Sequence, residues 1–376
     1  RQNDFGADMA LRKDALGFFT LDYAEFRKYF DGTGGTHRRF STLQPVDTDK
    51  ELALDIGKLG LETGLTLEGW PGLSFAYERE FKDGAKSRLT WTSVQEAAEA
   101  RKTGPSWQDV EEIADTFALN ANHELAGFAL SGQQRWEFVR SENVRHEVFR
   151  STTSTASNSL IRTQDQAPES TLMTTTLGAE HHFLNDRVFF ATGYHFAHLD
   201  SREYETLTEM DAAGVVTNFS RAENKFDSRA DNDYDSHTWV GNVTTQVGEQ
   251  WSVGTKFKSE VIKRESNSSY PAYSEYVASP EAFDLVVDHT ELNLTDTKAV
   301  RWGEGLSVRF TGLPRTALYT EVEFEQSRVL MREDRQSLDG PDSGNDAVAT
   351  EVFRRETVTD VRRGTWTLGG RTSPWP

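Results

Sequence analysis

Short breaks interrupt this chain at a nearly constant spacing, and they constrain its fold more than any other feature. They lie near Asp14, Trp70, Gly127, Asn185, Glu249, Pro314 and Trp375, at steps of 56, 57, 58, 64, 65 and 61 residues. Between successive breaks lie two strand-like runs, separated by a long polar stretch centred near residue 40, 104, 155, 218, 280 or 345. This order of strand, short turn, strand and long loop is typical of an outer-membrane β-barrel with short periplasmic turns and long extracellular loops.

Apolar and polar residues alternate on both sides of the breaks. After the break at Trp70, for example, Leu73, Phe75 and Tyr77 occupy every second position, with Ser74 between the first two. A period of two predicts strands whose two faces differ. A soluble antiparallel sheet with one wet face gives the same alternation, so the period alone leaves both structures open.

The placement of the tryptophans favours the membrane structure. A tilted membrane strand needs roughly 9–11 residues to cross the hydrocarbon layer. One group of tryptophans lies at the short breaks, and a second group lies roughly 9–11 residues away from them, which is the length of one membrane crossing. We predict that the two groups form aromatic girdles at the two membrane interfaces. The predicted girdle residues are Trp70, Trp136, Trp239, Trp251, Trp302, Trp366 and Trp375.

Composition limits the chemistry that this chain can perform. It has no cysteine, which excludes disulfides, thiol catalysis, zinc–thiolate sites and covalently bound c-type haem. Its net charge of −19 argues against nucleic-acid binding. We find no nucleophile elbow, no phosphate-binding loop and no distinct pair of carboxylates. We therefore expect no enzymatic activity, no catalytic residue and no cofactor on this chain; an outer-membrane phospholipase or protease is a third alternative.

The sequence thus predicts an all-β fold, an antiparallel up-and-down transmembrane barrel of which residues 1–376 supply about 13 strands. Single-chain bacterial barrels usually have an even number of strands. Residues 373–376, Ser-Pro-Trp-Pro, resemble another periplasmic turn. We therefore expect a larger barrel that continues beyond the C-terminus, and a signal peptide that precedes residue 1. The expected location is the bacterial outer membrane.

One segment departs from the strand pattern. Residues 93–115 are rich in alanine and glutamate, and a Gly104-Pro105 break is followed by a possible helix cap at Ser106 with Asp109 three residues later. This composition predicts one or two short helices in a loop.

Two groups of metal-ligating residues are too weak to predict a metal site. Asp231, Asp233 and Asp235 have the two-residue spacing that opens a calcium loop, but Ser236 replaces the required glycine and Asn242 replaces the required glutamate. An acidic loop that binds divalent ions loosely is the alternative. The histidines form the second group. We expect His182 and His195 to face inward, and His181 and His198 to face outward.

Three segments resemble MtrB/PioB-like outer-membrane proteins, the barrels of porin–cytochrome complexes in extracellular electron transfer. They are residues 22–32 (DYAEFRKYFDG), 72–87 (GLSFAYEREFKDGAKS) and 105–115 (PSWQDVEEIAD). In that family a very large barrel surrounds a multihaem c-type cytochrome and carries no cofactor itself. The resemblance implies that this chain belongs to a sleeve for a multihaem cytochrome, and that electrons cross the outer membrane through the haems of this partner.

The alternating face that points away from lipid should then line the lumen and contact the cytochrome. The lumen-facing candidates are Glu78, Glu80, Arg135, Glu137, Glu180, His182, Lys256, Lys258, Arg309, Glu321 and Glu323. The expected partners are the cytochrome, outer-membrane lipid and lipopolysaccharide. A general diffusion porin or a TonB-dependent transporter barrel is the alternative function.

Overall fold

The computed structural model describes residues 4–30, 52–96, 99–150, 159–211, 216–217, 225–279, 282–339 and 349–373. These residues form one antiparallel sheet of 15 strands. No helix of the described residues is long and apolar enough to cross a membrane. The strands are β1 (Asp4–Lys13), β2 (Gly17–Tyr29), β3 (Ala53–Leu65), β4 (Gly72–Glu96), β5 (Glu99–Leu125), β6 (Phe128–Arg150), β7 (Ser159–Gln166), β8 (Glu169–Phe183), β9 (Val188–Asp211), β10 (Val216–Thr217), β11 (Lys225–Val247), β12 (Trp251–Ser279), β13 (Ala282–Leu313), β14 (Thr316–Asp339) and β15 (Ala349–Thr372).

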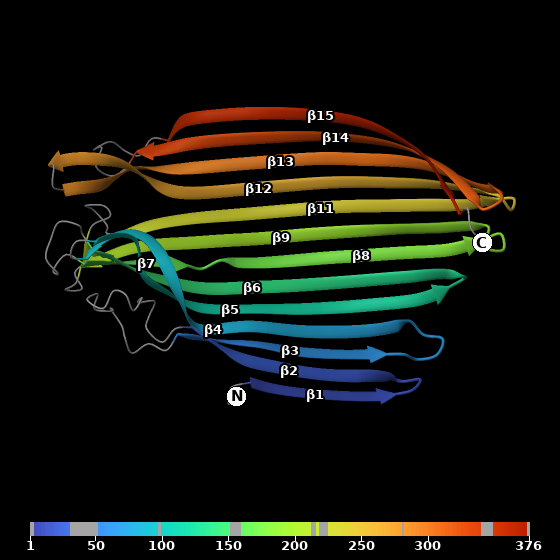
Figure 1. The fold of residues 1–376 in the computed structure, drawn as a ribbon, viewed down its shortest axis with the longest axis horizontal. Helices are drawn as coiled ribbons and strands as arrows, with labels where there is room; N and C mark the ends of the chain where they lie inside the picture. Colours follow the sequence, from blue (N-terminus) through green and yellow to red (C-terminus); the bar gives the residue numbers. More distant parts are fainter. Residues whose placement is uncertain are drawn as a thin grey trace.

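Strands that follow one another along the chain are neighbours in the sheet, with β1 and β15 at its two edges (Figure 1). β7 and β8 both pair with β6 and β9, and are two halves of one strand interrupted at Pro168, which has no N–H for the ladder. The two-residue β10 only extends the pairing of β9. With β7 and β8 taken together and β10 set aside, 13 strands of the described residues cross the sheet, and the predicted fold class is confirmed.

Short turns join the strands at one end of the sheet, on the right in Figure 1. The predicted breaks near residues 14, 70, 127, 185, 249 and 314 are all turns or bends between two strands. Several turn residues have positive φ, such as Gly127 at 81° and Asn185 at 55°, which a tight reversal requires. The predicted turn at Trp375 and the loop centres near residues 40, 155, 218, 280 and 345 lie outside the described residues.

The helices predicted for residues 93–115 are wrong. Residues 94–96 pair with residues 99–101, and Ser106 pairs with Arg88 on one side and Glu147 on the other. The described part of the segment therefore belongs to the long β4–β5 hairpin, and residue 104 lies within β5 rather than in a loop. Alanine and glutamate favour helices locally. Here a helix would leave backbone groups of β6 without their ladder partners, so sheet pairing outweighs the local preference.

The sheet has two chemically different faces. Directly paired residues in an antiparallel ladder lie on the same face, so the registers carry one face across the whole sheet. Lys256, for example, pairs with Asn242 and Gly305, and Gly305 pairs with Glu323. Followed in this way from strand to strand, all eleven predicted lumen-facing residues lie on one face.

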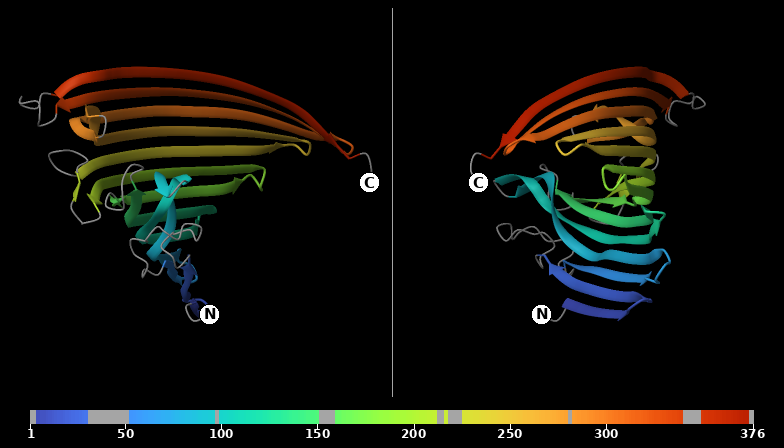
Figure 2. Two further views of the ribbon diagram at one scale, coloured as in Figure 1. Left: turned by 60° about the vertical axis from the view of Figure 1, so that its left-hand side comes forward. Right: turned by 90° about the vertical axis from the view of Figure 1, so that its right-hand side faces the viewer.

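The sheet is strongly curved (Figure 2). Side chains converge on the concave face of a curved sheet and lose exposure there, whereas they spread on the convex face. Most of the buried polar side chains share the face of Lys256, which identifies it as the concave, inner face; they are Ser106, Gln108, Ser141, Glu147, Ser236 and Glu291. Most of the exposed large hydrophobic side chains, such as Trp239, Leu306 and Phe324, lie on the opposite, convex face.

The strands are tilted as in a closed barrel. Residues that pair directly on successive strands form a row, which can be followed through eight strand-to-strand steps from β4 to β14. On β4 this row lies one position after the first residue of the strand, and on β14 it lies ten positions after the first residue. The row thus moves nine residues, or about 30 Å, along the strands while it crosses about 38 Å of sheet perpendicular to them. If the short turns all lie at one level, the strands are tilted by about 38° from the barrel axis. Membrane barrels have tilts of about 35–45°. The row is Leu73, Ala121, Gly132, Leu177, Tyr194, Trp239, Ser259, Trp302 and Gln326.

Candidate functional site: the charged inner face

A cross-strand ion-pair network lies at the centre of the inner face. The Lys256 ammonium on β12 lies 2.8 Å from a carboxylate oxygen of Glu321 and also contacts Glu323, both on β14. Lys256 reaches across β13 because its partner there is Gly305. A Cβ atom on Gly305 would lie 2.4 Å from Lys256 Cε, so a larger residue would block this path.

One further cross-strand network and one ion pair within a strand lie on the inner face. On β3, Lys58 lies 2.8 Å from Glu78 and 3.6 Å from Glu80, both on β4. On β6, Arg135 donates to Glu137 at 2.6 Å. These pairs are half-exposed, and such pairs contribute at most about 1 kcal/mol each to stability. Their main consequence is chemical, because they give the inner face fixed charges of both signs.

A depression of about 790 Å³ lies beside the Lys256 network. Glycines such as Gly178, Gly193 and Gly303 line it, and Gly178 and Gly193 are direct partners on β8 and β9. Since glycine has no side chain, these positions leave backbone exposed between charged neighbours. The depression is therefore a place where a polar guest can approach the wall closely. Its charged lining residues on the inner face are Glu180, Lys256, Lys258, Glu260, Arg301, Glu323 and Glu325.

The remaining inward candidates do not join the Lys256 network. Glu180 lines the depression, whereas His182 lies near the short turn and its Nδ1 is 3.7 Å from Asp186. Lys258 lies 3.8 Å from Glu260, which also accepts from Arg301 at 3.1 Å. The sequence pattern did not single out Glu260 and Arg301; both follow from extending the same alternation further along β12 and β13.

The outer face carries an uncharged band above the short turns. On β6, β9, β11, β12 and β14, the first Asp, Glu, Lys or Arg of the outer face lies 12 residues from the strand's turn end. With the tilt above, this spacing corresponds to a height of about 30 Å, close to the hydrocarbon thickness of a bilayer. These first charged residues are Arg140, Asp200, Asp235, Lys263 and Arg328.

The band is less regular elsewhere, since Arg79 on β4 lies seven residues and Glu304 on β13 nine residues from the turn end. A tilted sheet with a charged concave face and an apolar convex band of this height is the wall of a bacterial outer-membrane β-barrel.

Among the residues whose side chains the structure describes, the tryptophans of the strands lie on the outer face. Trp251 is at the turn end of β12, whereas Trp136 and Trp239 lie eight residues from the turn ends of β6 and β11. Trp239 donates its indole N–H to Thr192 at 2.8 Å, and Trp366 donates to Thr320 at the same distance. A threonine on the neighbouring strand thus satisfies the one polar group of an otherwise apolar ring.

Not all predicted girdle positions are equivalent. Trp302 lies 11 residues from the turn end of β13, Trp366 lies six from that of β15, and Trp70 lies in a turn. Trp375 is outside the described residues. The assignment of these residues to two membrane interfaces stays a prediction.

The four histidines do not form one cluster. The register places His182 and His195 on the inner face and His181 and His198 on the outer face, as predicted. His181 stacks on Phe128 near a short turn, with ring centroids 4.3 Å apart. His198 lies beside Asp235 instead, a contact that only the pairing of β9 with β11 creates.

Comparisons with known proteins find matches among solved structures but none among families or curated proteins. No protein-family profile and no curated protein matches the chain. The ferric-catecholate import receptor Fiu of E. coli K12 matches with a TM-score of 0.45 and 8% identity, over 95% of this chain and 64% of that one. The ferric yersiniabactin uptake receptor FyuA of Yersinia pestis matches with a TM-score of 0.45 and 9% identity, over 97% of this chain and 59% of that one. The CymD monoaromatic hydrocarbon channel matches with a TM-score of 0.24 and 9% identity, over 95% of this chain and 88% of that one.

This chain thus spans less than two thirds of the length of the two receptors. All three TM-scores lie below 0.5, so neither the fold nor the function is argued from these matches.

Proposed function

We propose that this chain forms part of the wall of an outer-membrane β-barrel that surrounds a multihaem c-type cytochrome, as in the MtrB/PioB-like family. The observation that carries the proposal is the inner face. It combines charges of both signs, in the half-exposed pairs of Lys58, Arg135 and Lys256 with glutamates, with a depression lined by glycines. Such a surface suits contact with a folded polar guest, because each charge can gain a partner across the interface.

We infer from the composition that the guest carries the haems and that this chain encloses it. The chain has no cysteine and so cannot hold c-type haem covalently. Electrons cross a membrane only between closely spaced redox centres, so the haems belong to the guest. The barrel excludes lipid with its apolar outer band and holds the guest with its inner charges. Among the described strands, β1 and β15 each pair on one side only. A strand edge inside a membrane needs a partner, so we infer that further strands complete the barrel.

Charge reversal of the inner face tests the proposal in the complete protein. Lys58→Glu combined with Lys256→Glu places like charges beside Glu78 and Glu321, and we expect at least a tenfold decrease in the haem that co-purifies from the native membrane. Arg328→Glu on the outer face is the control, because Arg328 points away from the lumen and pairs with Asp360 at 3.9 Å. We expect this control to retain its haem.

The measurement is the ratio of haem to barrel protein after purification in detergent, with heat-dependent gel migration as the test of folding. A wild-type barrel that purifies without haem would contradict the sleeve.

A diffusion porin is the second candidate, because a wet inner face of mixed charge also suits a water-filled lumen. The complete barrel would then conduct small ions freely in a planar bilayer, whereas a sleeve filled by its guest would not. A TonB-dependent transporter barrel differs from both, because it needs a plug domain and a TonB box.

A further inference from the structure

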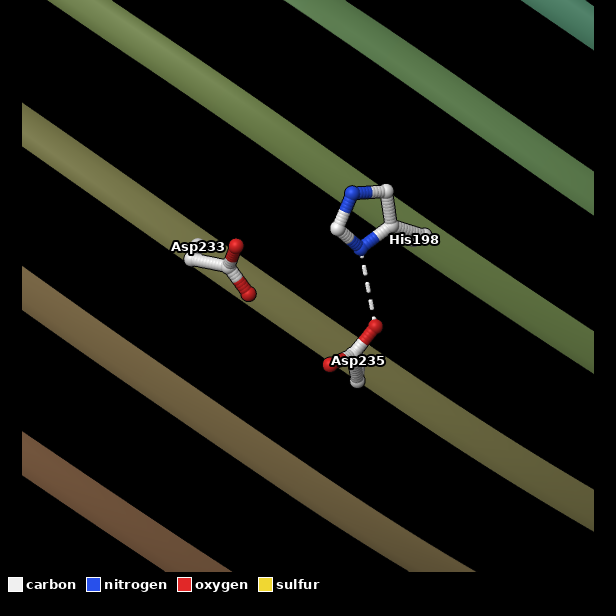
Figure 3. Close-up of side chains that lie close together, drawn as sticks. All are labelled: His198, Asp233 and Asp235. Atoms are coloured by element: carbon white, nitrogen blue, oxygen red, sulfur yellow. Dashed lines mark hydrogen bonds and ion pairs between the residues drawn. The ribbon is translucent and has the colours of Figure 1, made fainter.

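His198, Asp233 and Asp235 lie together on the outer face of the sheet, where β9 and β11 run side by side (Figure 3). His198 and Asp235 are direct partners in the ladder, and Asp233 lies two residues further along the same face of β11. His198 Nδ1 is 2.8 Å from Asp235 Oδ1. One ligand atom from each of the three residues lies within 4.8 Å of the other two.

The electrostatic surroundings of Asp233 are unfavourable without a cation. Its direct partner on β9 is Asp200, and its direct partner on β12 is Glu265. Carboxylates directly opposite one another repel. Among the described residues, Asp233 has no hydrogen bond and no ion pair within 4.0 Å. Three acidic side chains thus lie in one row across three strands.

The cationic side chains beside the cluster pair more closely with other carboxylates. Lys263 pairs with Asp235 in the ladder and attracts Asp233 and Asp235, but its ammonium lies 2.8 Å from Glu265. Arg202 donates to Asp200 at 3.4 Å. The repulsion between Asp200 and Asp233 is therefore only partly balanced by protein charges.

The three side chains are close enough to share one metal ion. Metal–ligand bonds of about 2.0–2.1 Å place tetrahedral ligand atoms about 3.3–3.4 Å apart. His198 Nδ1 and Asp235 Oδ1 are 2.8 Å apart, and one ligand atom of each of the three residues lies within 4.8 Å of the other two, so small side-chain rotations suffice to reach this spacing. A histidine nitrogen with two carboxylates selects a first-row transition metal, because Ca²⁺ and Mg²⁺ prefer six or more ligands that are all oxygen. We propose that His198, Asp233 and Asp235 bind a divalent transition-metal ion, with Zn²⁺ as the best chemical match.

The position of this site gives the ion a structural role. His198 lies 10 residues and Asp235 12 residues from the turn ends of β9 and β11, at the upper border of the uncharged band. The site is therefore at the level of the lipid headgroups and open to water. An ion bound there would join β9 to β11 and cancel the charge of two carboxylates. A water molecule or Asp200 would supply the fourth ligand.

Titration of the complete, metal-free barrel with ZnCl₂ in detergent micelles tests this proposal. Calorimetry should give one strong site for the wild type, and His198→Ala and Asp233→Asn should each weaken it at least tenfold. Asp233→Asn removes a like-charge contact, so this variant should fold at least as well as the wild type. His195→Ala is the matched control, because His195 is on the same strand but on the inner face, and it should bind Zn²⁺ as the wild type does.

Co²⁺ offers a second readout. Absorption bands of tetrahedral Co²⁺ should appear in the wild type and in His195→Ala, and be absent from His198→Ala. Equal Zn²⁺ affinity in the wild type and His198→Ala would overturn the proposal. Displacement of Zn²⁺ by an equal concentration of Ca²⁺ would also overturn it, because it would indicate an acidic surface without selectivity.

Discussion

Glycine positions decide how closely side chains and backbone of neighbouring strands can approach. Gly305 lets the Lys256 side chain cross β13 to reach β14, so a missing side chain on one strand creates a contact between two others. Gly84 on β4 has the opposite role. Its φ of +129° and a distance of 2.2 Å from an ideal Cβ to the Ala53 carbonyl oxygen leave no room for any side chain.

Gly84→Ala should therefore destabilise the barrel by about 1–3 kcal/mol, because alanine at this φ is strained and its Cβ would meet backbone that cannot move aside. Gly241→Ala is the matched control. Gly241 lies within β11, and a Cβ there would meet nothing within 4 Å. Urea unfolding in lipid vesicles, followed by tryptophan fluorescence, measures both variants. Equal midpoints for the two variants would contradict the strain at Gly84.

The sequence was sufficient to assign faces but not partners at this scale. Because a strand has a period of two, alternation alone placed all eleven inward candidates on one face. Which residue on a neighbouring strand lies opposite depends on the connection between the two strands. β9 and β11 are joined by a long connection, so the pairing of His198 with Asp235 could not be read from spacing.

At the scale of single elements, the strands are much longer than a membrane requires. β13 has 32 residues and β12 has 29, against roughly 9–11 needed to cross the hydrocarbon. The sheet therefore continues well beyond the uncharged band on the side of the long connections. This explains why residues 99–115 are strand. The helical composition there was the one strong local signal, and the pairing of β5 with β4 and β6 outweighs it.

Two neighbouring positions on β13 test the assignment of its faces. Leu306 lies on the outer face, seven residues from the turn end, and is 47% exposed. Leu306→Arg should destabilise the barrel by about 2–4 kcal/mol, since the guanidinium would lie in hydrocarbon near the midplane. Ser307→Arg is the control, because Ser307 lies on the inner face directly opposite Glu321, which can pair with the new charge.

The free energy of unfolding of both variants in lipid vesicles is the measurement. A larger loss in Ser307→Arg than in Leu306→Arg would mean that the concave and convex faces have been exchanged.

At the scale of the whole molecule, three features agree. The strand order follows the chain, the register shifts by about one residue per strand to give a tilt of about 38°, and the outer face of β6, β9, β11, β12 and β14 is uncharged over a height of about 30 Å. Each arises from a different property of the sequence: connectivity, turn position and side-chain pattern. Their agreement is what a barrel wall requires, because closure links strand tilt to stagger, and the membrane fixes the height.

The orientation of this wall in the membrane follows from the unequal lengths of its two ends. Short turns face the periplasm in bacterial barrels, and the longer connections face outward.

Cysteine labelling tests this orientation. Glu249 is an exposed turn residue, and its backbone is not among those with positive φ, so cysteine is tolerated there. A membrane-impermeant maleimide added to intact cells should label Ser343→Cys, in the long connection between β14 and β15, and should leave Glu249→Cys unlabelled. After the outer membrane is permeabilised, both should react. The native chain has no cysteine, so all labelling reports the introduced residue. Labelling of Glu249→Cys but not of Ser343→Cys in intact cells would reverse the barrel in the membrane, and would place the His198–Asp233–Asp235 cluster at the periplasmic border of the uncharged band instead of the outer one.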